Sequence, residues 1–142
     1  ALRDLRTAPL ESLGLALAVR QLAEEAAARG GLLARIEAPE ALPALSPEVE
    51  QCFYRVAQEA LENVVRHANA RWVTVSVRQN DEGLLLEVAD DGHGFEEEAA
   101  ASDYQFGLRG MRERARLIGA RLEVLSRPEE GTTIRLFKGG AT

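Results

Sequence analysis

The chain has 142 residues, of which 46% are hydrophobic, and a formal net charge of −6 at pH 7. This length suits one compact domain, and the apolar fraction is typical of a globular core. The acidic balance argues against nucleic acid as a partner, and no apolar run approaches the ~20 residues that a transmembrane helix needs. The charged residues 1–6 and the single Cys52 predict a cytoplasmic setting without a signal peptide, an intrachain disulfide or a thiolate metal site.

The apolar periodicity predicts alternating helices and strands along the chain. Residues 1–6 are expected to end a helix that begins upstream, and further helices are expected at 10–29, 48–69 and 107–118. Strands are expected at 32–37, 71–78, 84–89, 121–126 and 132–137, with a hairpin turn at 80–83. This mixture predicts an α+β domain in which helices pack on one face of a mixed, largely antiparallel sheet.

The helix expected at 48–69 has the clearest start signal, with Ser46 as its N-cap and Pro47 in its first turn. Four polar residues share one side of this helix, opposite its apolar stripe: Glu59, Asn63, Arg66 and His67. An amide oxygen suits Mg²⁺, which keeps several waters and takes phosphate oxygens, and the two basic side chains suit phosphate. The same pattern describes an ordinary solvated helix face, so the helix alone leaves both interpretations open.

Two glycine-containing loops are further candidates. In the loop at 90–95, Gly92 and Gly94 allow the backbone to approach a ligand closely, and Asp90 at the strand end could accept a hydrogen bond from an exocyclic amine. A tight turn explains this loop equally well. The segment 106–111 is expected to open a helix, whose exposed N–H groups would suit a phosphate. The hydroxyl of Thr132 could contact a base, although a simple hairpin entry explains it too.

The order of these motifs adds information that no single motif carries: Glu59-x-x-x-Asn63, Asp90-x-Gly92-x-Gly94, Gly107-x-x-Gly110 and Gly131-Thr132. In this order they resemble the N box, the two glycine boxes and the final Gly-Thr box of the GHKL ATPases, a superfamily that includes DNA gyrase, heat-shock chaperones, mismatch-repair ATPases and histidine kinases. The stretches QEALENVVRHANA at 58–70 and FGLRGMRER at 106–114 are similar to the nitrate-sensor-type subfamily of two-component sensor histidine kinases. The leader LRDLRTAPL at 2–10 resembles that family's junction between dimerisation helix and ATP-binding domain.

The resemblance implies the two-layer α/β sandwich known as the Bergerat fold, with ATP and Mg²⁺ as ligands. Residues 1–9 would end an upstream dimerisation helix or linker, and residues 10–142 would form the catalytic ATP-binding domain. Asn63 would ligate Mg²⁺ and Glu59 would orient a metal-bound water, so that these two residues form the catalytic pair. Arg66 and His67 would lie near the phosphates.

For the base, the resemblance implies that Asp90 accepts a hydrogen bond from the adenine amino group, helped by Thr132 through water. Gly92 and Gly94 would shape the base pocket. Residues 96–105 would form a lid over ATP. The second glycine box would form the hinge and the phosphate-facing end of that lid, with these ATP-contacting residues: Gly107, Leu108, Arg109, Gly110 and Met111.

Two departures from the family pattern matter. The family often has Pro-Gly-x-Gly-Thr before the last strand, and here Glu129 replaces the first of these glycines, which is expected to alter only the turn. The chain's two histidines, His67 and His93, lie in the N box and the first glycine box, and neither lies in a phosphoacceptor helix motif. The acceptor histidine is therefore expected upstream, on a helix pair outside this sequence.

The expected function is transfer of the ATP γ-phosphoryl group to a histidine of the protein's own dimerisation domain, within a homodimer that serves a response regulator. This domain would be cytoplasmic and not membrane-embedded, whether or not the full-length protein is anchored in the inner membrane. Alone it should bind Mg·ATP without phosphorylating itself. A serine kinase of the anti-sigma-factor type is an alternative that the leader disfavours. A nucleotide-binding module without transfer activity is another, which the intact Glu59 and Asn63 disfavour.

Overall fold

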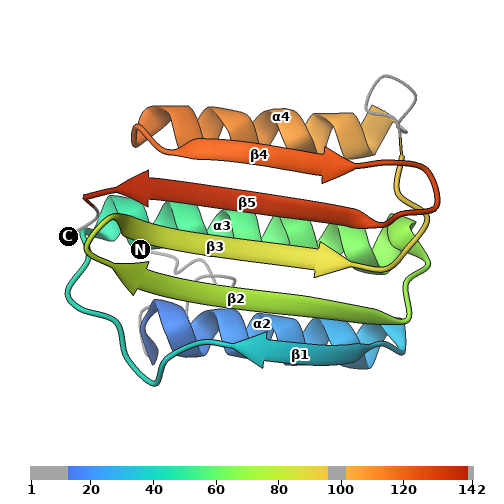
Figure 1. Ribbon diagram of the computed structural model, residues 1–142, viewed down its shortest axis with the longest axis horizontal. Coiled ribbons are helices and arrows are strands. Elements are labelled where there is room, and N and C mark those ends of the chain that lie inside the picture. Colours follow the sequence, from blue (N-terminus) through green and yellow to red (C-terminus); the bar gives the residue numbers. More distant parts are fainter. Residues whose placement is uncertain (1–12, 96–101, 141–142) are drawn as a thin grey trace, which may run out of the picture.

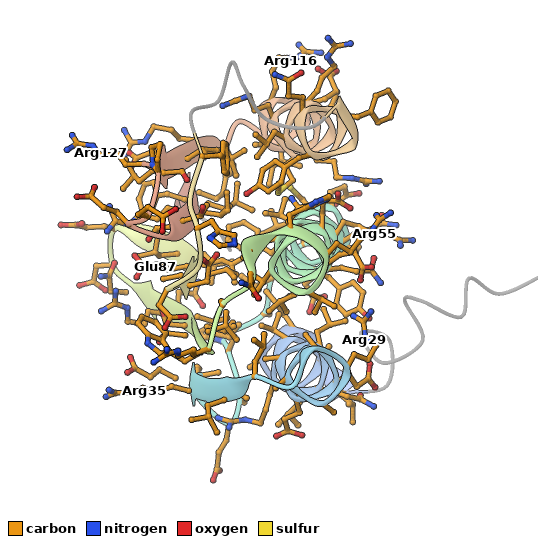
Figure 2. The ribbon with its side chains drawn as sticks, turned by 90° about the vertical axis from the view of Figure 1, so that its right-hand side faces the viewer. Arg29, Arg35, Arg55, Glu87, Arg116 and Arg127 are labelled. Atoms are coloured by element: carbon orange, nitrogen blue, oxygen red, sulfur yellow. The ribbon has the colours of Figure 1, made fainter. Side chains whose placement is uncertain are left out.

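The computed structural model describes residues 13–95 and 102–140 of the chain. Three α-helices lie side by side on one face of a five-stranded sheet, and the other face of the sheet is open (Figures 1 and 2). The described elements follow one another as α2 (Leu15–Gly30), β1 (Leu33–Glu37), α3 (Pro47–Asn63), the π-helix η1 (Val64–Ala68), β2 (Trp72–Asn80), β3 (Gly83–Asp90), α4 (Ser102–Leu117), β4 (Arg121–Ser126) and β5 (Thr132–Gly139). No helix within 13–95 or 102–140 is long and apolar enough to span a bilayer.

The sheet has the strand order β1-β2-β3-β5-β4. Only the β1–β2 pair is parallel, and the other three pairs are antiparallel. This confirms the predicted α+β architecture with a mixed, largely antiparallel sheet. The β2–β3 hairpin turns where expected, because the Asn80 side chain accepts hydrogen bonds from the backbone N–H groups of Glu82 and Gly83 at 2.8 and 3.2 Å.

The core lies between the helices and the covered face of the sheet. In the three central strands β2, β3 and β5, buried side chains largely alternate with more exposed ones, whereas the edge strands β1 and β4 are only partly buried. The largest strand side chains that are almost fully buried are Val73, Val75, Leu84, Leu86 and Leu136. The two ends of the chain's described part and the N-terminus of α3 lie at one end of this sandwich, and the C-terminus of α3 lies at the other (Figure 1).

Helix α3 runs through the centre of the helical layer. Its start follows the sequence signals: the Ser46 hydroxyl accepts a hydrogen bond from the Val49 N–H at 3.3 Å, and Pro47 occupies the first turn. Its end differs from the expected continuous helix to residue 69. The α-helix ends at Asn63, and a π-helix continues to Ala68, after which Asn69 adopts a left-handed conformation with φ 50°.

Helix α4 corrects a second expectation. The sequence predicts a helix that begins at Gly107, yet α4 begins at Ser102, so Gly107 and Gly110 lie inside the helix and not at its N-terminus. Each interior glycine costs about 1 kcal/mol relative to alanine. Four side chains at helical spacing are buried on the same helix, and each large apolar one contributes about 1.5–3 kcal/mol: Tyr104, Leu108, Met111 and Ala115. Burial therefore outweighs the glycine penalty.

The lone cysteine provides a test of this packing. Cys52 lies on α3 with 5% of its surface exposed, and burial raises the pKa of its thiol to about 11, with the charge of Arg114 acting in the opposite direction. At pH 8 the folded protein should hold a thiolate population more than about a hundredfold below that of a free thiol. Thiol reagents should therefore label the native chain far more slowly than the urea-unfolded chain. Equal labelling rates in the two states would contradict the packing of α3.

Candidate functional site

The candidate residues gather at the end of the sandwich where α3 gives way to η1. The C-terminal end of β3, the start of β5 and the start of α4 lie at the same end (Figure 1). Asp90, the last residue of β3, stands opposite Thr132, the first residue of β5, in the antiparallel register. The sheet thus joins two residues that are separated by more than forty positions in the sequence and that were predicted to contact the same base.

Asp90 and Asp91 are neighbours with different structural roles. Asp90 is 8% exposed, and its Oδ1 accepts a hydrogen bond from the Gly92 N–H at 2.8 Å. Burial raises the pKa of Asp90, while backbone N–H groups of Gly92 and Thr132 oppose this effect and the charge of Asp91 adds to it. Asp91 instead accepts from the N–H groups of Arg71 and Trp72 at 2.8 and 3.0 Å, which fixes the start of β2.

The loop at 90–95 packs closely against two other backbone segments, and its glycine positions leave no room for a side chain. A Cβ atom at Gly92 would collide with the carbonyl of Ala68 at the end of η1. Gly94, with φ 63°, packs in the same way against the carbonyl of Arg127, and Gly131, with φ 79°, against the carbonyl of Asp90. Glycine is therefore required at these positions both by space and, at Gly94 and Gly131, by backbone conformation.

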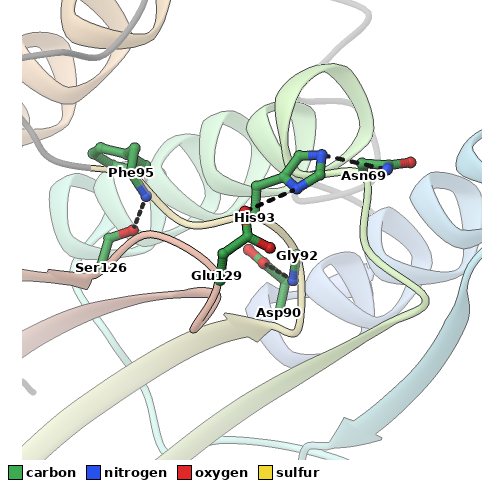
Figure 3. A network of polar contacts seen from close by, with 7 residues as sticks. All are labelled: Asn69, Asp90, Gly92, His93, Phe95, Ser126 and Glu129. Carbon is green, nitrogen blue, oxygen red and sulfur yellow. Dashed lines mark hydrogen bonds and ion pairs between the residues drawn. The ribbon is translucent and has the colours of Figure 1, made fainter.

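Hydrogen bonds hold this loop on both sides. The backbone N–H of His93 donates to the Ala68 carbonyl at 2.8 Å, and the N–H of Phe95 donates to the Ser126 hydroxyl at 2.9 Å (Figure 3). Ser126 also lies 2.7 Å from the hydroxyl of Thr132. Ser126 was not predicted as a site residue. Its position opposite Thr132 in the β4–β5 register is what indicates a role for this serine.

Asn63 lies inside the protein, which excludes the solvated helix face that was one of the two interpretations of the sequence. It is 4% exposed, and its Nδ2 atom is buried without a hydrogen-bond partner among the described residues. The change from α-helix to π-helix directly after Asn63 alters the angular positions of Arg66 and His67 relative to Glu59 and Asn63, and the four residues differ in burial. Arg66 is exposed, whereas Glu59 and His67 are half-buried.

Glu59 and Arg66 line a cleft of ≈ 520 Å³ between α3 and α4, together with Arg55, Gln58, Phe106, Gly107, Gly110, Met111 and Arg114. Gly107 lies so close to Glu59 that a Cβ atom on it would meet the carboxylate. The site residues therefore form two groups, one in this cleft and one around the buried Asp90 and Thr132. Leu108 and Met111 are 1% exposed, which leaves their side chains in the core, and Arg109 points to solvent.

Tyr104 is the residue that the sequence analysis missed most clearly. It belongs to the segment 96–105 that was expected to form a lid, of which 96–101 lie outside the described residues and 102–105 are helical. Its ring lies 4.3 Å from that of Phe95 and 5.4 Å from that of His67, centroid to centroid. Burial raises the pKa of Tyr104, as does the charge of Asp90, while a side-chain hydrogen bond with Thr132 opposes them. Its spacing of four residues before Leu108 is the signal that marks it as buried.

The sequence matches, over residues 48–139, the family of histidine kinase-, DNA gyrase B- and HSP90-like ATPases. The chain belongs to this ATPase family. An uncharacterized sensor-like histidine kinase of Chloroflexus aurantiacus is 34% identical in an alignment 141 positions long, which covers 94% of this chain and 24% of that protein. Sensor protein VraS of Staphylococcus aureus is 40% identical over 88 residues, which are 62% of this chain and 25% of VraS. The chain thus spans about a quarter of the length of these curated relatives.

Solved structures confirm the fold of this ATPase-family member. The blue-light activated histidine kinase of Erythrobacter litoralis EL346 superposes with a TM-score of 0.72 at 21% identity, over 93% of this chain and 46% of that one. Full-length ShkA in complex with AMPPNP superposes with a TM-score of 0.66 at 20% identity, over all of this chain and 32% of that one. The two-layer arrangement is therefore that of a histidine kinase ATPase domain.

Asp90→Asn tests the electrostatics of the buried carboxyl. Because the pKa of Asp90 is raised in the folded state, that state binds the proton more tightly than the unfolded chain does. The free energy of unfolding of the wild type should then fall as the pH rises from the unfolded pKa of about 3.9 through the folded pKa. The variant lacks this titration, so its stability relative to wild type should increase across that pH range in urea-unfolding measurements. A stability difference that is independent of pH would contradict the assignment.

Proposed function

We propose that this domain binds Mg·ATP and donates the γ-phosphoryl group to a histidine of an upstream dimerisation domain, as part of a sensor histidine kinase. The observation that carries the proposal is the meeting of Asp90, Thr132 and the end of α3 at one end of the sandwich, in a chain of this ATPase family. The solved ShkA complex, which has the same fold, contains AMPPNP. In the reaction the bond from the γ-phosphorus to the bridging oxygen breaks, a bond to a histidine nitrogen forms, and ADP leaves.

The polar groups around Asn63 are compatible with Mg²⁺. The described residues contain no group of three His, Cys, Asp or Glu side chains that could hold a metal by themselves. A cation here would therefore take most of its ligands from phosphate and water, which is how proteins usually bind Mg²⁺. The Oδ1 oxygen of Asn63 would supply the protein ligand, and Glu59 would orient a bound water. The buried Nδ2 of Asn63, which has no partner, would donate to a phosphate oxygen. When bound, Mg²⁺ would neutralise charge that develops on the phosphates.

For the base, we propose that the carboxylate of Asp90 accepts a hydrogen bond from the adenine amino group, assisted by Thr132 and with Gly92 and Gly94 shaping the pocket. Both polar side chains are buried, and Tyr104 is hydrogen-bonded to Thr132. An adenine ring in this position would therefore have to displace Tyr104, which lies in the first turn of α4. Arg66, on the rim of the α3–α4 cleft, and His67 would remain the cationic and polar groups for the phosphates.

Other parts of the proposal concern the full-length protein. Residues 1–9 would end the dimerisation helix or linker, residues 10–142 would form the catalytic domain, and the nitrate-sensor-type subfamily would be the closest grouping. The full-length protein would act as a cytoplasmic-facing homodimer with a response regulator as its second partner. VraS, which is similar to this chain, is named as a sensor protein.

Mixing this chain with Mg·ATP and a separately produced dimerisation domain tests the proposed reaction. We expect a phosphoryl group on the dimerisation domain that is lost in acid and kept in base, because phosphohistidine has this lability. An acid-stable phosphate would instead indicate the serine-kinase alternative. Nucleotide binding without any transfer would support the interaction module. The chain alone should not acquire phosphate.

Asn63→Ala should abolish the Mg²⁺ dependence of ATP binding while the fold is kept. The reason for the retained fold is that the substitution removes a buried amide nitrogen that has no partner, and the cost of that nitrogen, about 1–3 kcal/mol, offsets the small cavity left behind. The free energy of unfolding should change by no more than about 1 kcal/mol. Isothermal titration calorimetry with ATP, in the presence and absence of Mg²⁺, measures the effect.

Asp90→Asn is the matched control for this experiment, because it acts on the base and not on the metal. It should weaken ATP more than it weakens inorganic tripolyphosphate, and the residual ATP binding should keep its Mg²⁺ dependence. If Asn63→Ala bound Mg·ATP with unchanged affinity, the metal assignment would be wrong. If Asp90→Asn weakened ATP and tripolyphosphate equally, the adenine assignment would be wrong.

A further inference from the structure

One exposed side chain contacts both strained residues of the described chain. Among residues 13–95 and 102–140, only two non-glycine residues have positive φ, Asn69 with φ 50° and Glu129 with φ 66°. The Nε2 atom of His93 lies 3.3 Å from Asn69 Nδ2, and its Nδ1 atom lies 3.9 Å from Glu129 Oε1 (Figure 3). Residues in sparsely populated conformations persist only where the surrounding structure holds them, so this coincidence needs an explanation.

The backbone of His93 joins the same two segments as its side chain. Its N–H donates to the carbonyl of Ala68, next to Asn69, at 2.8 Å, and its carbonyl accepts from the N–H of Glu129. His93 therefore connects the end of η1 with the β4–β5 turn through four contacts. It lies between Gly92 and Gly94, which pack against these two segments without space for a Cβ atom.

The imidazole is suited to this bridging position. In the neutral form one ring nitrogen accepts a hydrogen bond and the other donates one. With the proton on Nδ1, the ring accepts from the Asn69 amide and directs an N–H toward the Glu129 carboxylate. The side chains of His93 and Glu129 are both at the surface, with exposures of 56% and 84%. The contact between them therefore serves geometry more than overall stability.

We propose that His93 is a positioning residue for the adenine pocket. By linking Asn69 and Glu129 it sets the distance between the end of η1 and the β4–β5 turn, and so fixes the loop at 90–95 that carries Asp90. Glu129 keeps its left-handed conformation, where a glycine would adopt it without steric cost, because its carboxylate is needed at His93. This inference rests on the proposed binding of ATP by the same site.

Glu129→Gly separates a positioning role from a structural one. Glycine relieves the left-handed conformation, so the variant should melt at the wild-type temperature or above it. The same variant removes the carboxylate that faces the His93 ring, so the affinity of the variant for ADP should fall. If Glu129 served only the stability of the turn, the variant would melt at a lower temperature and its affinity for ADP would be unchanged. Glu130→Ala is the matched control, since this exposed neighbour in the same turn does not contact His93.

The full test is a double-mutant cycle of His93→Ala and Glu129→Gly on the 142-residue chain, with calorimetry of Mg·ADP and of inorganic tripolyphosphate and with thermal unfolding of each variant. Each single variant should bind ADP about fivefold more weakly, the double variant no more weakly than either, and tripolyphosphate binding should be unchanged, because the two residues act as one unit on the base. Losses that multiply in the double variant, equal losses for tripolyphosphate, or wild-type affinity in Glu129→Gly would each overturn the role of His93. A wild-type chain that binds neither ligand would instead overturn the proposed function.

Discussion

The close backbone contact between the loop at 90–95 and its two neighbours is the constraint on which the site depends. Gly92 against Ala68, Gly94 against Arg127 and Gly131 against Asp90 leave no space for a Cβ atom. These contacts bring the end of β3, the end of η1 and the β4–β5 turn to one point. Without them the register of β3 and β5 would still place Asp90 opposite Thr132, but the loop could not pack this closely against η1 and the β4–β5 turn. The three glycines thus connect the sheet to the helical layer where the site lies.

Buried polar groups at this end of the molecule lower the stability of the fold and are available to bind a ligand. Asp90 is buried, and burial raises its pKa, so the folded state bears a cost for holding this carboxylate in its charged form. Asn63 presents an amide nitrogen without a partner, which is a further cost. A ligand whose phosphate oxygens accept from the Asn63 amide and whose exocyclic amine donates to Asp90 would compensate for both. Such local costs are commonly found where a site is kept ready for a ligand.

Much of the fold could be predicted from the sequence, because alternation in the strands and the Ser46-Pro47 signal at α3 are local properties. Strand β4 has the predicted bounds. The start of α4 could not be predicted, because the polar composition of 96–105 hid Tyr104, whose burial depends on packing against distant elements. The burial of Asn63 was also missed, because its polar side chain was assigned to a solvent-facing side of the helix. Past Asn63 the predicted helical period fails, since residues 64–68 form a π-helix. Glu129 was expected to alter only a turn, and its contact with His93 joins positions 36 residues apart. The roles of the individual site residues remain predictions.

A nuclear magnetic resonance titration of the isotope-labelled chain with Mg·AMPPNP shows whether the nucleotide binds at the end of the sandwich that holds Asn63, Asp90 and Thr132. A second cleft, of ≈ 640 Å³, lies on the open face of the sheet and is lined by Arg78, Glu87, Arg135 and Phe137 among others, none of which belongs to the motifs of the site. Two of its charges are paired with each other, since Arg135 lies 2.6 Å from Glu87 (Figure 2 shows Glu87 on this open face). We expect the largest chemical-shift changes at the amides of Asn63, of the loop at 90–95 and of Thr132, and none on the open face. Shifts centred on Arg78, Glu87 and Arg135, with Asn63 and the loop unperturbed, would contradict this expectation.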